Sequence, residues 1–212
     1  MPFLLVAGLG NPGFRYEKTR HNLGFRFLDV IQQSFSFPSF GYERKFLGFF
    51  SRKEEEKQTL LLLKPDTYMN LSGKSIRAVA DYLGIGLEEV VVVHDDLDIP
   101  FGTVKIKLGG GDAGHKGIAS TIASLGAPSF WRIRLGIGRP PEGVNSSNYV
   151  LSPFSGAEEK IIAEQWVPFW QSIFDVLVHE GKVAAMNKFS GRSCIPVSPC
   201  HMAVAFSDGE KQ

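Results

Sequence analysis

The feature that most constrains the fold is the run "EVVVVHDD" at residues 89–96, in which four consecutive valines precede a histidine and two aspartates. Successive side chains of a strand point to opposite faces, so an unbroken β-branched run requires apolar cover on both faces. The run therefore predicts a central strand of a sheet with helices on each side. It also places polar side chains at the carboxyl end of that strand.

The segments around this strand alternate between strand and helix patterns. Strands are expected at 3–8, 45–53, 59–65, 103–111 and 130–138, and helices at 22–35, 70–84, 115–126 and 157–187. Asn22 is the expected cap of the first helix, Gly84 closes the second, and Pro168 should kink or divide the last. This alternation predicts an α/β fold, a three-layer sandwich around a mixed, mostly parallel and twisted sheet flanked by helices.

Length and composition indicate one folded domain with a tail. The chain has 212 residues, of which 43% are hydrophobic, enough for a sizeable core. Residues 1–189 are expected to form that single domain. Residues 190–212 mix proline, serine and glycine without periodicity and are expected to be a flexible tail. The tail holds both cysteines, Cys194 and Cys200, away from histidine and aspartate clusters, which favours a reducing compartment and no metal site. Neither a signal peptide nor a membrane span is expected.

Positive charge is concentrated in one part of the chain. The formal net charge is only +1, but residues 101–141 hold six lysines and arginines and a single aspartate. This excess is consistent with a local surface that faces phosphates. A solvated face with counter-charges on neighbouring segments is the alternative.

The stretch "VAGLGNPGFRYEKTRHN", residues 6–22, has the glycine spacing of a dinucleotide-binding loop. That loop requires a helix starting on the glycines and an acidic residue after the next strand. Here the helical pattern begins about nine residues after Gly13, and Asp29 lies inside that helix. The pattern therefore argues against NAD binding. The glycines are expected to let a tight loop leave the strand, with open space beside the sheet edge. The "GGGDAGHKG" loop lacks the Gly-Lys-Ser/Thr of a P-loop.

Polar side chains follow three of the expected strands. Asn11 and His21 come after the first strand, Asn70 after the strand at 59–65, and Asp95 ends the valine strand. A histidine oriented by a carboxylate can activate water as a general base, and asparagine amides can position a carbonyl or a water. The alternatives are a solvated acidic turn, or a magnesium site built from the three aspartates of "HDDLD" (Asp95, Asp96 and Asp98). For the Asn70 region the alternatives are helix capping and core packing.

Five motifs are spread over residues 3–189: "GLGNPG..Y..TRHN.G", "KP.TYMNLSG", "HDDLD.P.G", "K.K.GGG..GHKG" and "R.RLGIGRP". In their order and spacing they resemble the bacterial-type peptidyl-tRNA hydrolase family. The resemblance implies a cytoplasmic, monomeric esterase that needs no metal or other cofactor. Such an enzyme cleaves the ester between a peptide and the 3′ ribose of tRNA, and so recycles tRNA released prematurely from ribosomes.

The resemblance also implies roles for individual residues. His21 is the general base, Asp95 orients it, and Asn11 and Asn70 position water and substrate. Residues implied to contact the substrate or the tRNA are Tyr16, Met69, Asn70, Lys107, His115, Lys116 and Arg134, with Lys107 and Arg134 gripping the tRNA 5′ phosphate. His115 either contacts the substrate as a second residue of its loop or caps the helix that follows it.

One position departs from the family's pattern. Most members read Gly-His-Asn-Gly where this chain reads "GHKG", so Lys116 replaces an asparagine. Lysine donates hydrogen bonds but accepts none, so it cannot reproduce the carbonyl contact of an amide, and we expect altered substrate handling. Active members of the family that carry lysine at this position imply that activity is retained. Two other functions are alternatives to this esterase: a non-catalytic RNA-binding relative of the same fold, and a metal-dependent hydrolase.

The turn-rich segment 142–155 has a composition that permits movement as a lid.

Overall fold

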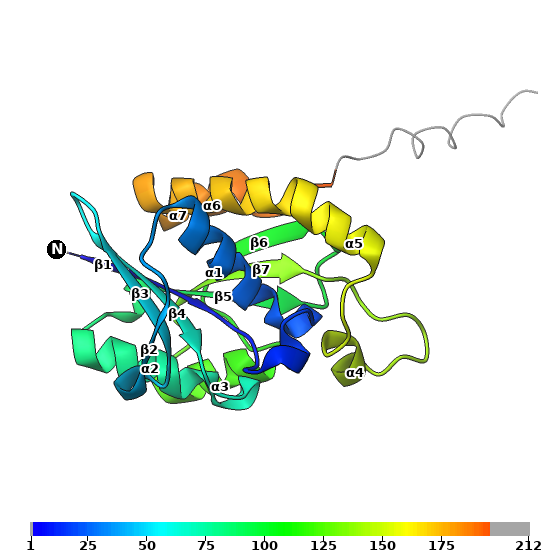
Figure 1. Ribbon diagram of the computed structural model, residues 1–212, viewed down its shortest axis with the longest axis horizontal. Coiled ribbons are helices and arrows are strands. Elements are labelled where there is room, and N and C mark those ends of the chain that lie inside the picture. The colour runs from blue at the N-terminus through cyan, green and yellow to red at the C-terminus, as the bar shows by residue number, and fades with distance from the viewer. Residues whose placement is uncertain (1, 196–212) are drawn as a thin grey trace, which may run out of the picture.

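The structure is a computed structural model that describes residues 2–195, and its centre is an eight-stranded sheet. The strand order is β2-β3-β4-β1-β5-β7-β6-β8 (Figure 1). The strands are β1 (Phe3–Gly8), β2 (Gly41–Glu43), β3 (Gly48–Glu54), β4 (Thr59–Pro65), β5 (Val90–Asp96), β6 (Thr103–Leu108), β7 (Trp131–Gly136) and β8 (Arg192–Ser193). The central neighbours β4, β1, β5 and β7 run parallel, whereas β3 and β6 run antiparallel to them. This confirms the mixed, mostly parallel sheet.

Helices cover both faces of the sheet, as the valine run requires. One face packs against α1 (Leu23–Ser34), α6 (Val167–His179) and α7 (Lys182–Phe189), and the other against α2 (Ser72–Leu83) and α3 (Lys116–Leu125) (Figure 1). Val91 and Val93 join the first core, while Val90 and Val92 join the second. The three-layer α/β prediction is therefore confirmed, with β5 buried along its whole length.

The last helical region is irregular at two places. A π-helical turn, Ile162–Trp166, lies between α5 (Gly156–Ile161) and α6, immediately before Pro168. Proline has no N–H to donate, so the hydrogen-bonding pattern changes there. The helical main chain nevertheless continues without a gap from Gly156 to His179, so Pro168 does not divide it. A break at Gly181, with φ 93°, separates α6 from α7. Sequence patterns missed β2 and also α4 (Ser146–Val150), since both are too short to show periodicity.

Gly8 and Gly10 of the first loop serve close packing, so the expectation of open space is wrong for them, whereas Gly13 has open space and a φ of 101°. A Cβ on Gly8 would lie 2.3 Å from the carbonyl oxygen of Gly24, and one on Gly10 would lie 2.7 Å from the Phe25 ring. The start of α1 therefore packs directly on the end of β1. The loop itself continues into a 3₁₀ turn, Phe14–Tyr16, and α1 begins only at Leu23. This geometry agrees with the argument against a dinucleotide-binding loop.

The folded part of the chain extends beyond residue 189. Residues assigned to the tail add strand β8 to the edge of β6, and the Ser190 hydroxyl bonds both the N–H and the carbonyl of Ile106. The Cys194 thiol donates to the Gly102 carbonyl at 3.2 Å, and burial raises its pKa to about 12. Residues 196–212, with Cys200, lie outside the described residues. Within the described part, none of the helices has the length and apolar character needed to cross a membrane.

Candidate active site

The polar residues predicted at strand ends meet in one cleft. Because β4, β1 and β5 are parallel neighbours, the loops after them converge at one edge of the sheet. The cleft there has a volume of about 800 Å³. Of the predicted site residues, its lining includes Asn11, Tyr16, His21, Met69, Asn70, Asp95, His115 and Lys116.

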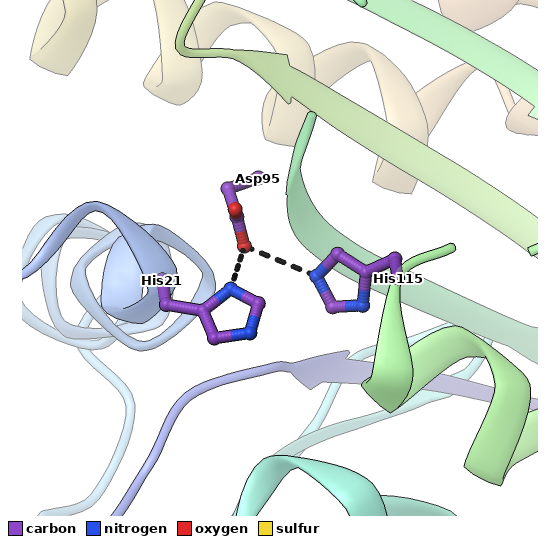
Figure 2. Close-up of side chains that lie close together, drawn as sticks. All are labelled: His21, Asp95 and His115. Carbon is purple, nitrogen blue, oxygen red and sulfur yellow. Dashed lines mark hydrogen bonds and ion pairs between the residues drawn. The ribbon is translucent and has the colours of Figure 1, made fainter. Parts of the chain in front are cut away.

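Asp95 is the centre of the site. Its Oδ1 lies 2.8 Å from His21 Nδ1 and 3.1 Å from His115 Nε2, so two histidines converge on one carboxylate oxygen (Figure 2). Asp95 is only 2% exposed. Burial raises the pKa of its carboxyl, but the two histidines outweigh burial and hold that pKa well below its usual range. Asp95 is therefore an ionised, acceptor-only group.

This contact determines the protonation of His21. Since ionised Asp95 only accepts, His21 must carry its proton on Nδ1, which leaves Nε2 as the basic nitrogen at the cleft. Burial lowers the pKa of His21, but the charge and hydrogen bond of Asp95 outweigh burial, and the net shift is upward. The charge of Lys116 acts in the opposite direction and lowers this pKa.

His115 is both a helix cap and a contact of Asp95. Its Nδ1 accepts from the main-chain N–H groups of Gly117 and Ile118, at 3.1 and 3.3 Å. An accepting Nδ1 is unprotonated, so the neutral ring carries its proton on Nε2 and donates it to Asp95. The cap that the sequence offered as one alternative is therefore present, and contact of His115 with the substrate stays a prediction.

A third histidine, His94, completes the support of the site and was not singled out from the sequence. Its Nδ1 donates to the Asp95 carbonyl at 2.7 Å, and its ring lies 4.8 Å from that of His115. Burial lowers its pKa well below the usual value, so it stays neutral. The sequence signal that could have identified His94 was its position within the buried valine strand.

Asn11 is held by a residue that the sequence assigned to capping. Asn22 lies just before α1, but its side chain does not cap the helix; it accepts from the Asn11 N–H and donates to the Asn11 carbonyl, both at 2.9 Å. The Asn11 side-chain oxygen accepts from the Met69 N–H at 2.8 Å. This leaves the Asn11 amide NH₂ as a donor for the cleft. Asn70 is exposed on the same lining.

His21, Asp95 and His115 are also the one group in the described residues with metal-like spacing, within 4.8 Å of one another. Their hydrogen bonds oppose metal binding, because His115 Nε2 could bind a metal only by losing the proton that it donates to Asp95. The magnesium alternative is opposed as well. Asp96 pairs with Arg134 at 2.8 Å, and Asp98 pairs with Arg139 at 2.6 Å.

Lys107 and Arg134 lie outside the cleft lining, on the antiparallel pair β6–β7. The pKa of Lys107 is lowered by burial and then by the charges of Arg134 and Arg132. These charge effects indicate that the three cations lie close together. Arg132 is buried and donates to the carbonyls of Gly110 and Gly111, so it fixes the glycine loop. Within residues 2–195 Lys107 forms no ion pair, whereas Arg134 is partly neutralised by Asp96.

Comparison with known proteins gives consistent matches over most of the chain. The sequence model of a family described as Peptidyl-tRNA hydrolase matches residues 5–196. The chain is 43% identical over 186 residues to a peptidyl-tRNA hydrolase of Sorangium cellulosum, covering 87% of this chain and 82% of that protein. It is also 43% identical to one of Desulfitobacterium hafniense, covering 88% and 98%. A crystal structure of peptidyl-tRNA hydrolase from Acinetobacter baumannii superposes with a TM-score of 0.83 at 32% identity, covering 91% of this chain and 97% of that one.

Proposed function

The chain belongs to the peptidyl-tRNA hydrolase family, and from that premise we propose how its cleft hydrolyses the ester bond of peptidyl-tRNA. In this reaction water attacks the ester carbonyl, and the peptide is released from the 3′ ribose. The observation that carries the proposal is the contact of His21 Nδ1 with buried Asp95 at 2.8 Å, which leaves Nε2 basic toward the cleft.

His21 is the general base of this mechanism. Its Nε2 takes a proton from water as the water oxygen attacks the carbonyl carbon, and the resulting imidazolium is stabilised by the Asp95 carboxylate. The same nitrogen then returns the proton to the leaving ribose oxygen when the tetrahedral intermediate collapses. General-base catalysis of this kind contributes about 10² to 10⁴ in rate.

Asn11 and Asn70 position the reacting groups. The Asn11 amide NH₂ donates to the developing oxyanion, because its oxygen is already used by the Met69 N–H. Asn70, exposed on the opposite loop, contacts the water or the ester. Tyr16 and Met69 contribute walls of the cleft, and Lys116 offers a cation at the start of α3.

Lys107 and Arg134 hold the tRNA by a phosphate outside the cleft. Their place on β6–β7 separates binding of the tRNA body from the chemistry at His21. As the resemblance to the family implies, we infer that the enzyme acts as a monomer. Its substrate arises at ribosomes, which assigns it to the cytoplasm.

The test uses an N-blocked aminoacyl-tRNA beside the matching free aminoacyl ester. The wild type should cleave the tRNA ester far faster than the free ester, and His21→Ala should abolish turnover while leaving tRNA affinity nearly intact. His179→Ala, which removes an exposed histidine of α6, is the matched control and should keep full activity. A fully active His21→Ala variant would refute the assignment, and a wild type that binds tRNA without cleaving it would favour the RNA-binding alternative.

A further inference from the structure

Arg20 stands directly before the general base, yet the mechanism above does not use it. It is only 7% exposed. Its Nη2 lies 2.8 Å from each carboxylate oxygen of Glu158, and its Nη1 donates to the Pro153 carbonyl and approaches Ser152 Oγ at 3.4 Å. Its main-chain N–H donates to the Ser152 carbonyl at 3.1 Å. One buried residue therefore joins the turn that carries His21 to the segment around 152–158.

Two aromatic rings enclose the same guanidinium. It lies 4.4 Å from the ring centre of Tyr149, which belongs to α4, and 4.7 Å from that of Phe154. Arginine stacks favourably on aromatic faces. A lysine ammonium cannot reproduce this stacking while also bonding Glu158 and the Pro153 carbonyl through two separate nitrogens. α4 consequently lies next to the turn Arg20–Asn22 (Figure 1).

The segment held in this way forms one wall of the cleft. Residues 146–151, which we call the α4 wall, line it through Ser146, Ser147, Val150 and Leu151. All four side chains are uncharged, so this wall suits the neutral ester and peptide end of a substrate, whereas phosphates suit the basic β6–β7 strands. A second contact, from the Tyr149 hydroxyl to the Ile137 carbonyl at 3.0 Å, also holds the wall.

We propose that Arg20 is a positioning residue that holds the α4 wall beside His21 and so determines how tightly the ester and peptide end of the substrate binds. The inference rests on the proposed function, because it needs the substrate in this cleft. His21 has independent support from Asp95, and the neighbouring Asn22 is bonded to Asn11. Weakening the contacts of the Arg20 guanidinium therefore moves the α4 wall and leaves His21 in place.

This placement predicts a specific kinetic signature. Arg20→Lys should raise KM roughly tenfold, with kcat and the pH profile nearly unchanged, since it loses the stacked contacts and the separate bonds of the two guanidinium nitrogens to Glu158 and Pro153. Glu158→Gln removes the negative charge from the same pair and should also raise KM. A purely structural role would instead lower the active fraction, which reduces kcat at constant KM and leaves the pH profile alone.

Arg26→Lys is the matched control. Arg26 also pairs with a glutamate of α5: its two terminal nitrogens bond the two carboxylate oxygens of Glu159, at 2.9 and 2.7 Å. Both of its hydrogen bonds go to that residue and none to the α4 wall. Its KM should equal that of the wild type. Arg20→Ala is less informative, since it leaves the Glu158 carboxylate unpaired and sheltered.

The experiment measures kcat and KM for an N-blocked aminoacyl-tRNA and for the same ester on a short CCA trinucleotide. The KM increase of Arg20→Lys should be the same for both substrates, because the wall faces the ester end. Equal KM in Arg20→Lys and Arg26→Lys, or a fall in kcat alone, would overturn the proposal. A wild type that does not cleave peptidyl-tRNA, or an active His21→Ala, would overturn the proposed function instead, so the two failures are distinguishable.

Discussion

Replacing Asp95 with asparagine removes one negative charge and keeps an oxygen that can accept from both His21 and His115. The wild-type contacts, at 2.8 and 3.1 Å, both use the same carboxylate oxygen, so the amide oxygen can take its place. The substitution therefore separates the charge of Asp95 from its role in orienting the two rings.

The size of the effect follows from the charge that develops on His21. In the ground state the ring is neutral, and in the transition state it becomes an imidazolium beside the carboxylate. Two unit charges about 4 Å apart attract by about 4 kcal/mol at an effective dielectric constant near 20. Asp95 is 2% exposed, so water screens this attraction weakly. Since about 1.36 kcal/mol corresponds to a tenfold change in rate, kcat should fall roughly 10³-fold with KM little changed.

The same variant should shift the pH dependence in a defined direction. His21 acts only when neutral, so activity falls as the pH drops through its pKa. Asp95 raises this pKa against the opposing effect of burial, and Asp95→Asn leaves only burial and the charge of Lys116, both of which lower the pKa. The acidic limb of kcat/KM should therefore move to lower pH.

The assay is single-turnover hydrolysis of N-blocked aminoacyl-tRNA across pH. Asp175→Asn is the control, because it breaks an exposed aspartate–histidine contact of 3.5 Å on α6 and should have no effect. A kcat loss below tenfold, or an acidic limb that stays in place or moves upward, would refute the role given to the Asp95 charge.

Three further predictions test the remaining parts of the site. Lys107→Ala should lower kcat/KM, and the slope of log kcat/KM against log salt should decrease in magnitude by roughly one, as expected when one phosphate contact is lost; an unchanged slope would contradict the contact. Lys116→Asn should move the acidic limb of kcat/KM to higher pH, because the cation that lowers the pKa of His21 is removed; Lys116→Arg should retain the wild-type profile. Exhaustive treatment with EDTA should leave hydrolysis unchanged, and a loss that Mg²⁺ or Zn²⁺ restores would favour the metal-dependent alternative.

The layers of the fold could be predicted because their signals are local. The valine run requires cover on both faces, and helix periodicity locates α1, α2 and α3 to within a few residues. The strand order could not be predicted in this way, because it depends on pairings between segments far apart in sequence. Only the order β4-β1-β5 explains why loops near Asn11, Asn70 and Asp95 share one cleft.

The side-chain network of the site was predictable only in part for a similar reason. A histidine and an aspartate at strand ends indicate a general base, so His21 and Asp95 were accessible from residue type and position. His115 donates to the same Asp95 oxygen that His21 contacts. That contact depends on the direction of α3, which no local sequence pattern indicates. Asn22 illustrates the opposite error, since its position favours a cap while its side chain reaches across the loop to Asn11.

The position of His115 also bears on why a lysine can follow it. His115 caps α3 and donates to Asp95, so the main chain at the first residue of that helix is fixed from both sides. An exchange of asparagine for lysine at residue 116 therefore alters the side chain in the cleft without moving the helix. Its largest physical consequence is a positive charge facing His21, which opposes the rise in pKa caused by Asp95. The departure from the family's usual asparagine is thus expected to appear in the pH dependence of hydrolysis while the fold stays the same.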